Sequence, residues 1–142
     1  MNFSAENNSV SVTESKIILY ADDDVDDRTW FSDACKAASQ TWLLQFVETG
    51  HDVIAYLHNE RLPRPSLIML DLNMPGLDGR QTLKQLKGHP AFQHIPVVML
   101  TTSINRIDKE VCRKLGAASL IAKPFTMGQW QQVVKDLEVF IQ

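Results

Sequence analysis

Short apolar runs alternate along the chain with stretches that have the period of a helix. Runs of strand length occupy residues 16–21, 41–48, 66–70, 95–100 and 118–122, and the third and fourth are interpreted as apolar on both sides. Strands that are apolar on both sides belong in a sheet that is covered on both faces. The runs therefore predict a parallel sheet.

Between the runs, apolar residues recur every three or four positions and predict one helix after each strand. The marker residues are Phe31, Ala34 and Ala38; Val53 and Leu57; Leu83 and Leu86; Ile104, Ile107, Val111 and Leu115; and Met127, Trp130, Val133, Val134, Leu137, Phe140 and Ile141. We interpret these stripes as core. Thr126 and Gln129 form a capping-box pattern at the start of the last helix.

Five strand and helix units in strict alternation predict an α/β fold with a doubly wound sheet and right-handed crossovers. This domain is expected to occupy residues 16–142. Residues 1–15, which are rich in Ser and Asn and have no period, predict a flexible N-terminal tail. Nothing in the pattern remains for a second domain.

Composition narrows the class of protein. The chain has 142 residues, of which 44% are hydrophobic and 22% charged, and its net charge is -3. This balance disfavours binding to nucleic acid or to an anionic membrane, and no apolar run has the ~20 residues needed to span a bilayer. We therefore expect a cytoplasmic protein. Cys35 and Cys112 have no ligand or redox spacing and are expected to be reduced, structural thiols.

Polar residues stand where the predicted strands end. Asp22 and Asp23 follow the first strand, Asp71 the third, Thr101 the fourth and Lys123 the fifth. Parallel strands bring their carboxyl ends to one edge of the sheet, so these side chains should share a cleft. Carboxylates from two strands suit Mg²⁺, which bridges to phosphate. An aspartate there can also accept a phosphoryl group, and Asp71 is the natural candidate.

Four segments carry a family resemblance. "ILYADDD" (18–24), "LIMLDLNMPGLDG" (67–79), "VVMLTTS" (97–103) and "AKPF" (122–125) resemble the signature segments of the receiver domain of two-component response regulators. The similarity extends over about residues 16–141 and is greatest to single-domain receivers that partner phytochrome-like sensor kinases. It implies a flavodoxin-like, CheY-like (βα)5 sandwich whose parallel strands have the order 2-1-3-4-5.

The resemblance also implies a phosphoacceptor and a metal site. Asp71 would accept the phosphoryl group from a phosphohistidine. Asp23 would bind Mg²⁺ directly, Asp22 would act through water, and the backbone carbonyl of Asn73 would complete the metal site together with Asp71.

Further roles follow from the same resemblance. Thr101 would bond the phosphoryl group and move with it, and Lys123 would pair with Asp71 and then with a phosphoryl oxygen. Asn73 and Ser103 would tune dephosphorylation, and the bond between Lys123 and Pro124 is expected to be cis. Many receivers carry an aromatic residue where this chain has Leu120. The signal is then expected to pass through repacking of the helix around 104–115, or to be weak.

The implied partners are proteins. A sensor histidine kinase or phosphotransfer protein would supply the phosphoryl group. A downstream protein would bind the face made by the fourth helix, the fifth strand and the fifth helix, and a second copy of the chain is a further candidate. No output domain is expected, and the protein would act as a signalling switch that catalyses only its own phosphorylation and dephosphorylation.

The residues disfavour several other interpretations. A calcium loop at residues 22–33 fails because Asp27 stands where such loops have Gly, and Asp33 where they have Glu. Asp26 and Asp27 are better explained by the dipole at the start of the first helix, and Asp78 and Gly79 as turn residues. An aspartyl phosphohydrolase is disfavoured by Asn73, where such enzymes carry a second acid. A binding module that needs no phosphorylation is disfavoured by the full set of Asp, Thr and Lys residues.

Overall fold

The computed structural model describes residues 15–141, and strands and helices alternate along this range. The strands are β1 (Ile17–Ala21), β2 (Leu43–Val47), β3 (Leu67–Asp71), β4 (Val97–Thr101) and β5 (Ser119–Ala122). The helices are α2 (Val25–Ala37), α3 (Gly50–His58), α4 (Gly79–Lys87), α5 (Arg106–Leu115) and α6 (Met127–Leu137). The tail predicted for residues 1–15 lies, except for Ser15, outside the described residues.

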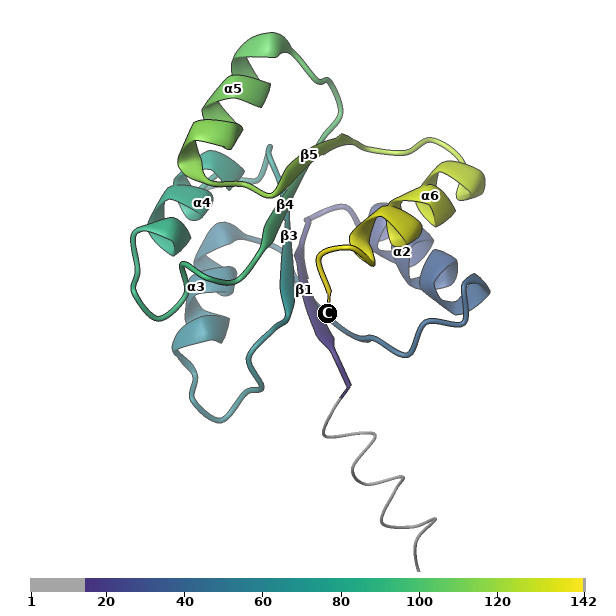
Figure 1. Cartoon of the computed structure of the whole chain (residues 1–142), viewed down its shortest axis with the longest axis horizontal. Coiled ribbons are helices and arrows are strands. Elements are labelled where there is room, and N and C mark those ends of the chain that lie inside the picture. Colours follow the sequence, from purple (N-terminus) through teal and green to yellow (C-terminus); the bar gives the residue numbers. More distant parts are fainter. Residues whose placement is uncertain (1–14, 142) are drawn as a thin grey trace, which may run out of the picture.

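The strands form one parallel sheet in the order β2-β1-β3-β4-β5. Helices α2 and α6 cover one face, and α3, α4 and α5 cover the other (Figure 1). The order in which strands are added to the sheet reverses after β2: β2 lies on one side of β1, and β3 lies on the other. The predicted flavodoxin-like fold and strand order are confirmed.

The sheet separates two hydrophobic cores. Along β1, Ile18 and Tyr20 point into the core beneath α2 and α6, whereas Leu19 and Ala21 point into the core beneath α3, α4 and α5. This alternation follows from the two-residue period of a strand. Trp130 fills the first core and is almost fully buried, so it needs no ligand to explain it.

Strands β1, β3 and β4 are buried at every position, as their apolar sequences predict, whereas β2 is half-exposed because it lies at the edge of the sheet. The predicted strand ends differ from the structure by one residue at two functional positions. Asp71 and Thr101 are the last residues of β3 and β4, rather than the first residues after them. Their backbones are therefore fixed by the sheet.

The prediction that Ala38, Ile104 and Ile107 belong to the core is wrong. Ala38, the C-cap of α2, is exposed. Ile104 and Ile107 are 45% and 76% exposed, and Cys112 is the buried residue of α5. The first turn of α5 instead directs Asp108 toward α4, where its carboxylate pairs with Arg80 at 2.5 Å. The first turn of α5 therefore contacts α4 through this ion pair, while Ile107 is exposed.

Helix starts follow sequence signals closely. Thr126 is the N-cap of α6 and accepts a hydrogen bond from the Gln129 backbone N–H at 3.1 Å. The Gln129 side chain, however, accepts from the Phe125 N–H and not from the cap residue. Asp78, interpreted as a turn residue, forms a complete capping box with Gln81 at the start of α4.

Two further features bear on the class of protein. Cys35 and Cys112 are buried and free, as expected of structural thiols. In the described range, none of the helices is long and apolar enough to cross a bilayer.

Candidate phosphoryl and metal site

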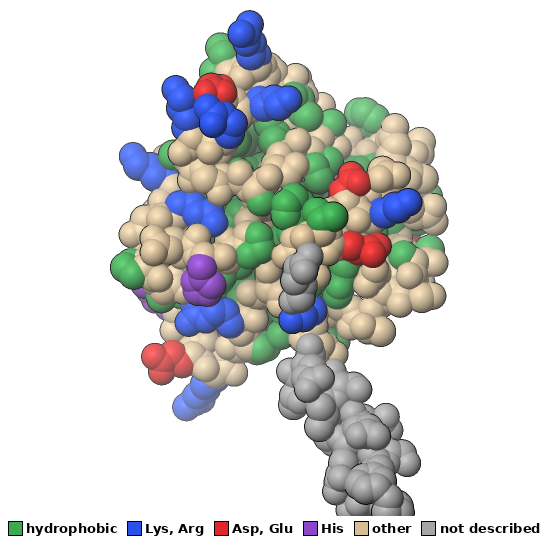
Figure 2. Space-filling model, viewed as in Figure 1, with side chains coloured by type: hydrophobic (Ala, Val, Ile, Leu, Met, Phe, Trp, Pro, Cys, Tyr) green, Lys and Arg blue, Asp and Glu red, His purple; other side chains and the backbone are tan. Residues whose placement is uncertain are grey.

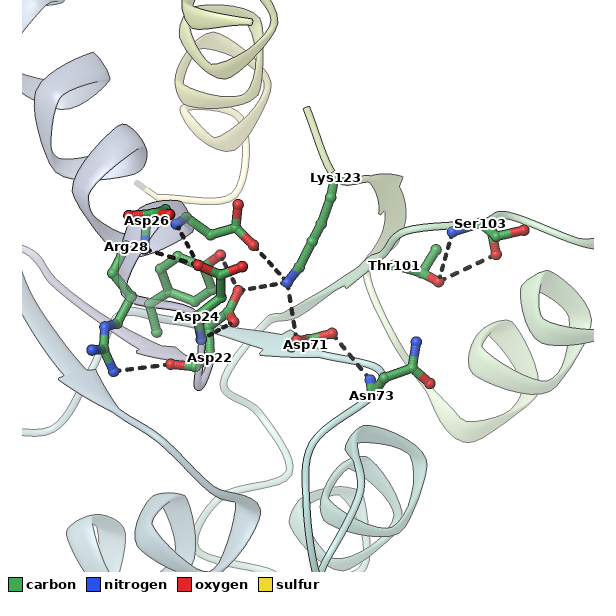
Figure 3. A network of polar contacts seen from close by, with 11 residues as sticks. Asp22, Asp24, Asp26, Arg28, Asp71, Asn73, Thr101, Ser103 and Lys123 are labelled. Atoms are coloured by element: carbon green, nitrogen blue, oxygen red, sulfur yellow. Dashed lines mark hydrogen bonds and ion pairs between the residues drawn. The ribbon is translucent and has the colours of Figure 1, made fainter. Parts of the chain in front are cut away.

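The carboxyl ends of β1, β3 and β5 bring three side chains to one edge of the sheet. Asp22 follows β1, Asp71 ends β3, and Lys123 follows β5, so residues that are far apart in sequence meet here (Figure 3). The ammonium nitrogen of Lys123 lies 2.9 Å from Asp22 Oδ2 and 3.0 Å from Asp71 Oδ2. The gathering of acid and amine predicted from the alternating pattern is therefore present.

A third carboxylate joins the lysine. Asp27, in the first turn of α2, places its Oδ2 atom 2.8 Å from Lys123 Nζ. The sequence explains Asp27 by the dipole at the start of the helix and does not predict this contact. The sequence feature that could have indicated this contact is the position of Asp27 in the first turn of a helix that begins close to Asp22.

The same edge of the sheet offers a place for a cation. Asp22, Asp23 and Asp71 each present a carboxylate oxygen, and these oxygens lie within 4.8 Å of one another. Asp23 is exposed, whereas Asp22 and Asp71 are buried. All of these donors are oxygen atoms, the kind that hard divalent cations prefer, so the residues fit such an ion.

Asp22 is held in place by its neighbours. Its Oδ2 atom accepts a hydrogen bond from the buried Tyr20 hydroxyl at 2.7 Å, and its Oδ1 atom accepts from the Asp24 N–H at 2.9 Å. The Arg28 guanidinium donates to the Asp22 backbone carbonyl at 3.0 Å. These contacts engage both carboxylate oxygens and fix the orientation of the Asp22 side chain.

Asp71 is fixed from its backbone and from the loop that follows it. Its Oδ1 atom accepts the Asn73 N–H at 3.0 Å, while Oδ2 faces Lys123. Gly79, the first residue of α4, packs so close that a Cβ atom there would lie 2.6 Å from the Asp71 carbonyl oxygen. Gly79 is therefore more than a turn residue, because only a residue without a side chain lets α4 start against β3.

Burial and charge act against each other in this cluster. Desolvation raises the pKa of the Asp71 carboxyl, although the Asn73 N–H and Lys123 oppose that shift. Burial alone would lower the pKa of Lys123, but its contacts with Asp27, Asp22 and Asp71 outweigh burial and raise it. The lysine is therefore held firmly in its charged form, as the counter-charge of the carboxylates.

Thr101 and Ser103 lie beside the cluster but bond to each other. The Thr101 hydroxyl donates to the Ser103 carbonyl at 3.2 Å and accepts from the Ser103 N–H at 3.3 Å. Figure 3 shows this pair to one side of Lys123 and Asp71. Leu120 lies in β5 opposite Met99 and packs on the core beneath α3, α4 and α5, away from the polar group.

The predicted cis bond before Pro124 is wrong, because the Lys123–Pro124 peptide is trans. The trans form is favoured by about 0.5–1 kcal/mol even before proline. Here the Lys123 N–H also donates to the Thr101 carbonyl at 2.7 Å, which fixes the strand direction before the proline. The lysine side chain reaches its three carboxylates with the trans geometry.

Comparison with known proteins agrees with this geometry. Residues 18–135 match the response regulator receiver domain. Response regulator Rcp1 of Synechocystis sp. is 33% identical over 129 residues, which cover 88% of each chain.

Two solved structures are similar in fold and sequence. The Mn²⁺-bound form of response regulator Rcp1 has a TM-score of 0.79 and 32% identity, and the match covers 88% of this chain and 93% of that one. The phosphorylated cyanobacterial phytochrome response regulator RcpA has a TM-score of 0.81 and 34% identity, with 89% and 94% covered.

The matched segment contains the Asp22, Asp23, Asp27, Asp71 and Lys123 cluster. It also contains all five strand and helix units except Ile17 of β1 and the end of α6. Sequence, fold and the residues at the edge of the sheet therefore agree. The chain belongs to the response regulator receiver family of two-component signalling proteins.

Proposed function

We propose that the protein is a switch in which Asp71 accepts a phosphoryl group in a reaction that depends on Mg²⁺. The observation that carries this proposal is the meeting of Asp22, Asp23 and Asp71 with Lys123 in one partly buried site. Receiver domains of this family receive phosphoryl groups from histidine kinases and interact with protein targets. The donor here would be a sensor histidine kinase or a phosphotransfer protein.

In the proposed reaction, a carboxylate oxygen of Asp71 attacks the phosphorus atom of a phosphohistidine on the partner. The new bond joins Asp71 oxygen to phosphorus, the bond from phosphorus to the imidazole nitrogen breaks, and the electron pair stays on the imidazole. Lys123, already 3.0 Å from Asp71, is placed to pair with a phosphoryl oxygen. The bound cation would supply further neutralisation of the phosphoryl charge.

The remaining site residues take supporting roles in this proposal. Asp23 would hold Mg²⁺ directly, Asp22 through water, and Asn73 through its backbone carbonyl. The Thr101 hydroxyl would leave Ser103 to bond the phosphoryl group. The exposed side chains of Asn73 and Ser103 would control the access of water, and with it the rate of dephosphorylation.

The response would be read by a protein that binds α5, β5 and α6. Figure 2 shows Lys and Arg side chains over α5 and hydrophobic side chains near β5 and the end of α6. Ile107 of α5 and Phe125, in the loop between β5 and α6, are 76% and 83% exposed. A target with acidic and apolar side chains would fit, and a second copy of the chain is the alternative. Since Leu120 replaces the usual aromatic residue, the change would reach this face through repacking of α5.

The test is phosphorylation with a small acyl phosphate donor and Mg²⁺, followed by mass spectrometry of the digested protein. We expect one phosphoryl group at Asp71, no uptake by Asp71→Asn, and normal uptake by Asp33→Asn, an exposed aspartate of α2. Asp23→Ala should take up no phosphoryl group even when Mg²⁺ is present. Uptake by Asp71→Asn equal to wild type would refute the assignment. Steady turnover of an added phosphomonoester, far above one equivalent per chain, would favour a hydrolase.

A further inference from the structure

Lys123 is shared between two kinds of carboxylate. Asp22 and Asp71 belong to the group of oxygens that fits a divalent cation, and Asp27 does not belong to that group. Asp27 nevertheless makes a contact with the lysine as short as either of the others, 2.8 Å, and its side chain is only 17% exposed. The cluster thus contains one acid that faces the lysine without facing the metal position.

The ammonium group of Lys123 has three protons and three carboxylate partners within 3.0 Å. A phosphoryl oxygen can pair with the lysine only if one of these contacts is given up. A divalent cation bound there would attract Asp22 and Asp71 more strongly than the lysine does, because it carries twice the charge. Asp27 would then remain as the carboxylate that pairs with the ammonium group.

We propose that Asp27 is a positioning residue that acts through Lys123 and sets the balance between cation and anion binding at the site. This inference rests on the proposed phosphoryl acceptance at Asp71. By attracting Lys123 toward α2, Asp27 reduces the competition of the lysine for Asp22 and Asp71, which favours the cation. The same attraction opposes the movement of Lys123 to a phosphoryl oxygen, which disfavours the anion.

Removing this one carboxylate should therefore shift two affinities in opposite directions. Without Asp27, Lys123 pairs more closely with Asp22 and Asp71 and competes with Mg²⁺. The lysine also becomes freer to meet an anion at Asp71. A loosened α2 would instead weaken both kinds of binding, because both depend on the same strand ends.

The test compares Asp27→Asn with Asp26→Asn in the full chain. Asp26 lies in the same first turn of α2 and the substitution makes the same change in charge, but its side chain is exposed. Isothermal titration calorimetry gives the dissociation constant for Mg²⁺ alone. A second titration with beryllofluoride, an anion that mimics a phosphoryl group, follows at saturating Mg²⁺.

For Asp27→Asn we expect roughly tenfold weaker Mg²⁺ binding and roughly tenfold tighter beryllofluoride binding, the size of one charge-assisted contact. Asp26→Asn should stay within about twofold of wild type in both titrations, because exposed charges are screened. Asp27→Glu, which keeps the carboxylate, should fall between Asp27→Asn and wild type.

Two results would overturn the inference: equal values for Asp27→Asn and Asp26→Asn, or a change of both affinities in the same direction. Failure of the proposed function has a different signature. In that case wild type and Asp71→Asn would bind beryllofluoride equally poorly, whatever residue stands at position 27, and the role of Asp27 would fall with it.

Discussion

Replacing Lys123 with methionine is the most direct test of the charge balance in the site. The side chain is 9% exposed and its ammonium group pairs with three carboxylates, two of which belong to buried residues. Methionine keeps much of the volume and removes the charge. We expect the metal-free variant to be strongly destabilised, because Asp22 and Asp71 would then face each other without a counter-charge.

The magnitude follows from the distances. At an effective dielectric constant near 20, unit charges 2.9 Å apart, as for Lys123 and Asp22, attract by about 6 kcal/mol. The cost of burying the charges offsets much of this attraction. Removing one partner from a buried ion pair costs about 3–5 kcal/mol, which is the loss in free energy of unfolding that we expect for Lys123→Met in a chelator.

Mg²⁺ should reverse part of this loss. Once the lysine is absent, the cation no longer competes with an ammonium group for Asp22 and Asp71. Each tenfold gain in Mg²⁺ affinity adds about 1.4 kcal/mol of stability at saturating metal. The stability of Lys123→Met should therefore depend on Mg²⁺ more steeply than that of wild type.

Urea unfolding with EDTA and with Mg²⁺ measures both effects, and the buried Trp130 provides a fluorescence signal. Lys135→Met, at an exposed lysine in the last turn of α6, is the control and should change stability by less than about 0.5 kcal/mol. The reasoning is refuted if Lys123→Met loses less than about 1 kcal/mol in EDTA, well below the buried-pair range. It is equally refuted if Mg²⁺ stabilises the variant and wild type by the same amount.

Two further outcomes follow from packing and burial. Gly79→Ala should lower the free energy of unfolding by about 1–3 kcal/mol, because its Cβ atom would lie 2.6 Å from the Asp71 carbonyl oxygen. Gly128→Ala is the control and should be neutral or stabilising, because the nearest neighbour of its Cβ atom would be 3.9 Å away. Urea unfolding midpoints compare the two variants, and equal midpoints would contradict the close approach at Gly79. Burial raises the pKa of the Cys35 thiol to about 12 and also raises the pKa of the Cys112 thiol. Iodoacetamide at mildly alkaline pH should therefore label both thiols only after unfolding. Rapid labelling of the folded protein would contradict this expectation.

The position of the site could be predicted because short sequence patterns identify the strands and their direction. Apolar runs mark the strands, strict alternation makes them parallel, and parallel strands end together. Asp22, Asp71 and Lys123 could be placed in one cleft from these rules alone. The roles of Asp23, Thr101 and Asn73 came from the resemblance and remain predictions.

Features that depend on side chains meeting across the fold could not be predicted in the same way. Asp27 has a sufficient local explanation in the helix dipole, and nothing near it in sequence indicates that Lys123 arrives from 96 positions away. The stripe through Ile107 has the right period, but periodicity does not show that Asp108 takes the side facing α4. The bond before Pro124 is decided by less than about 1 kcal/mol, which no sequence pattern resolves.

The closed pairing of Thr101 with Ser103 has a consequence for how the protein would ignore weak stimuli. Two hydrogen bonds must be surrendered before the Thr101 hydroxyl can turn toward Asp71. At a net ~1 kcal/mol each, these hydrogen bonds stabilise the resting loop by about 2 kcal/mol. A group bound at Asp71 would have to favour the rearranged loop by at least this free energy before half of the molecules adopted it. Under the proposed function, only a group whose binding at Asp71 exceeds this free energy would draw the Thr101 hydroxyl away from Ser103.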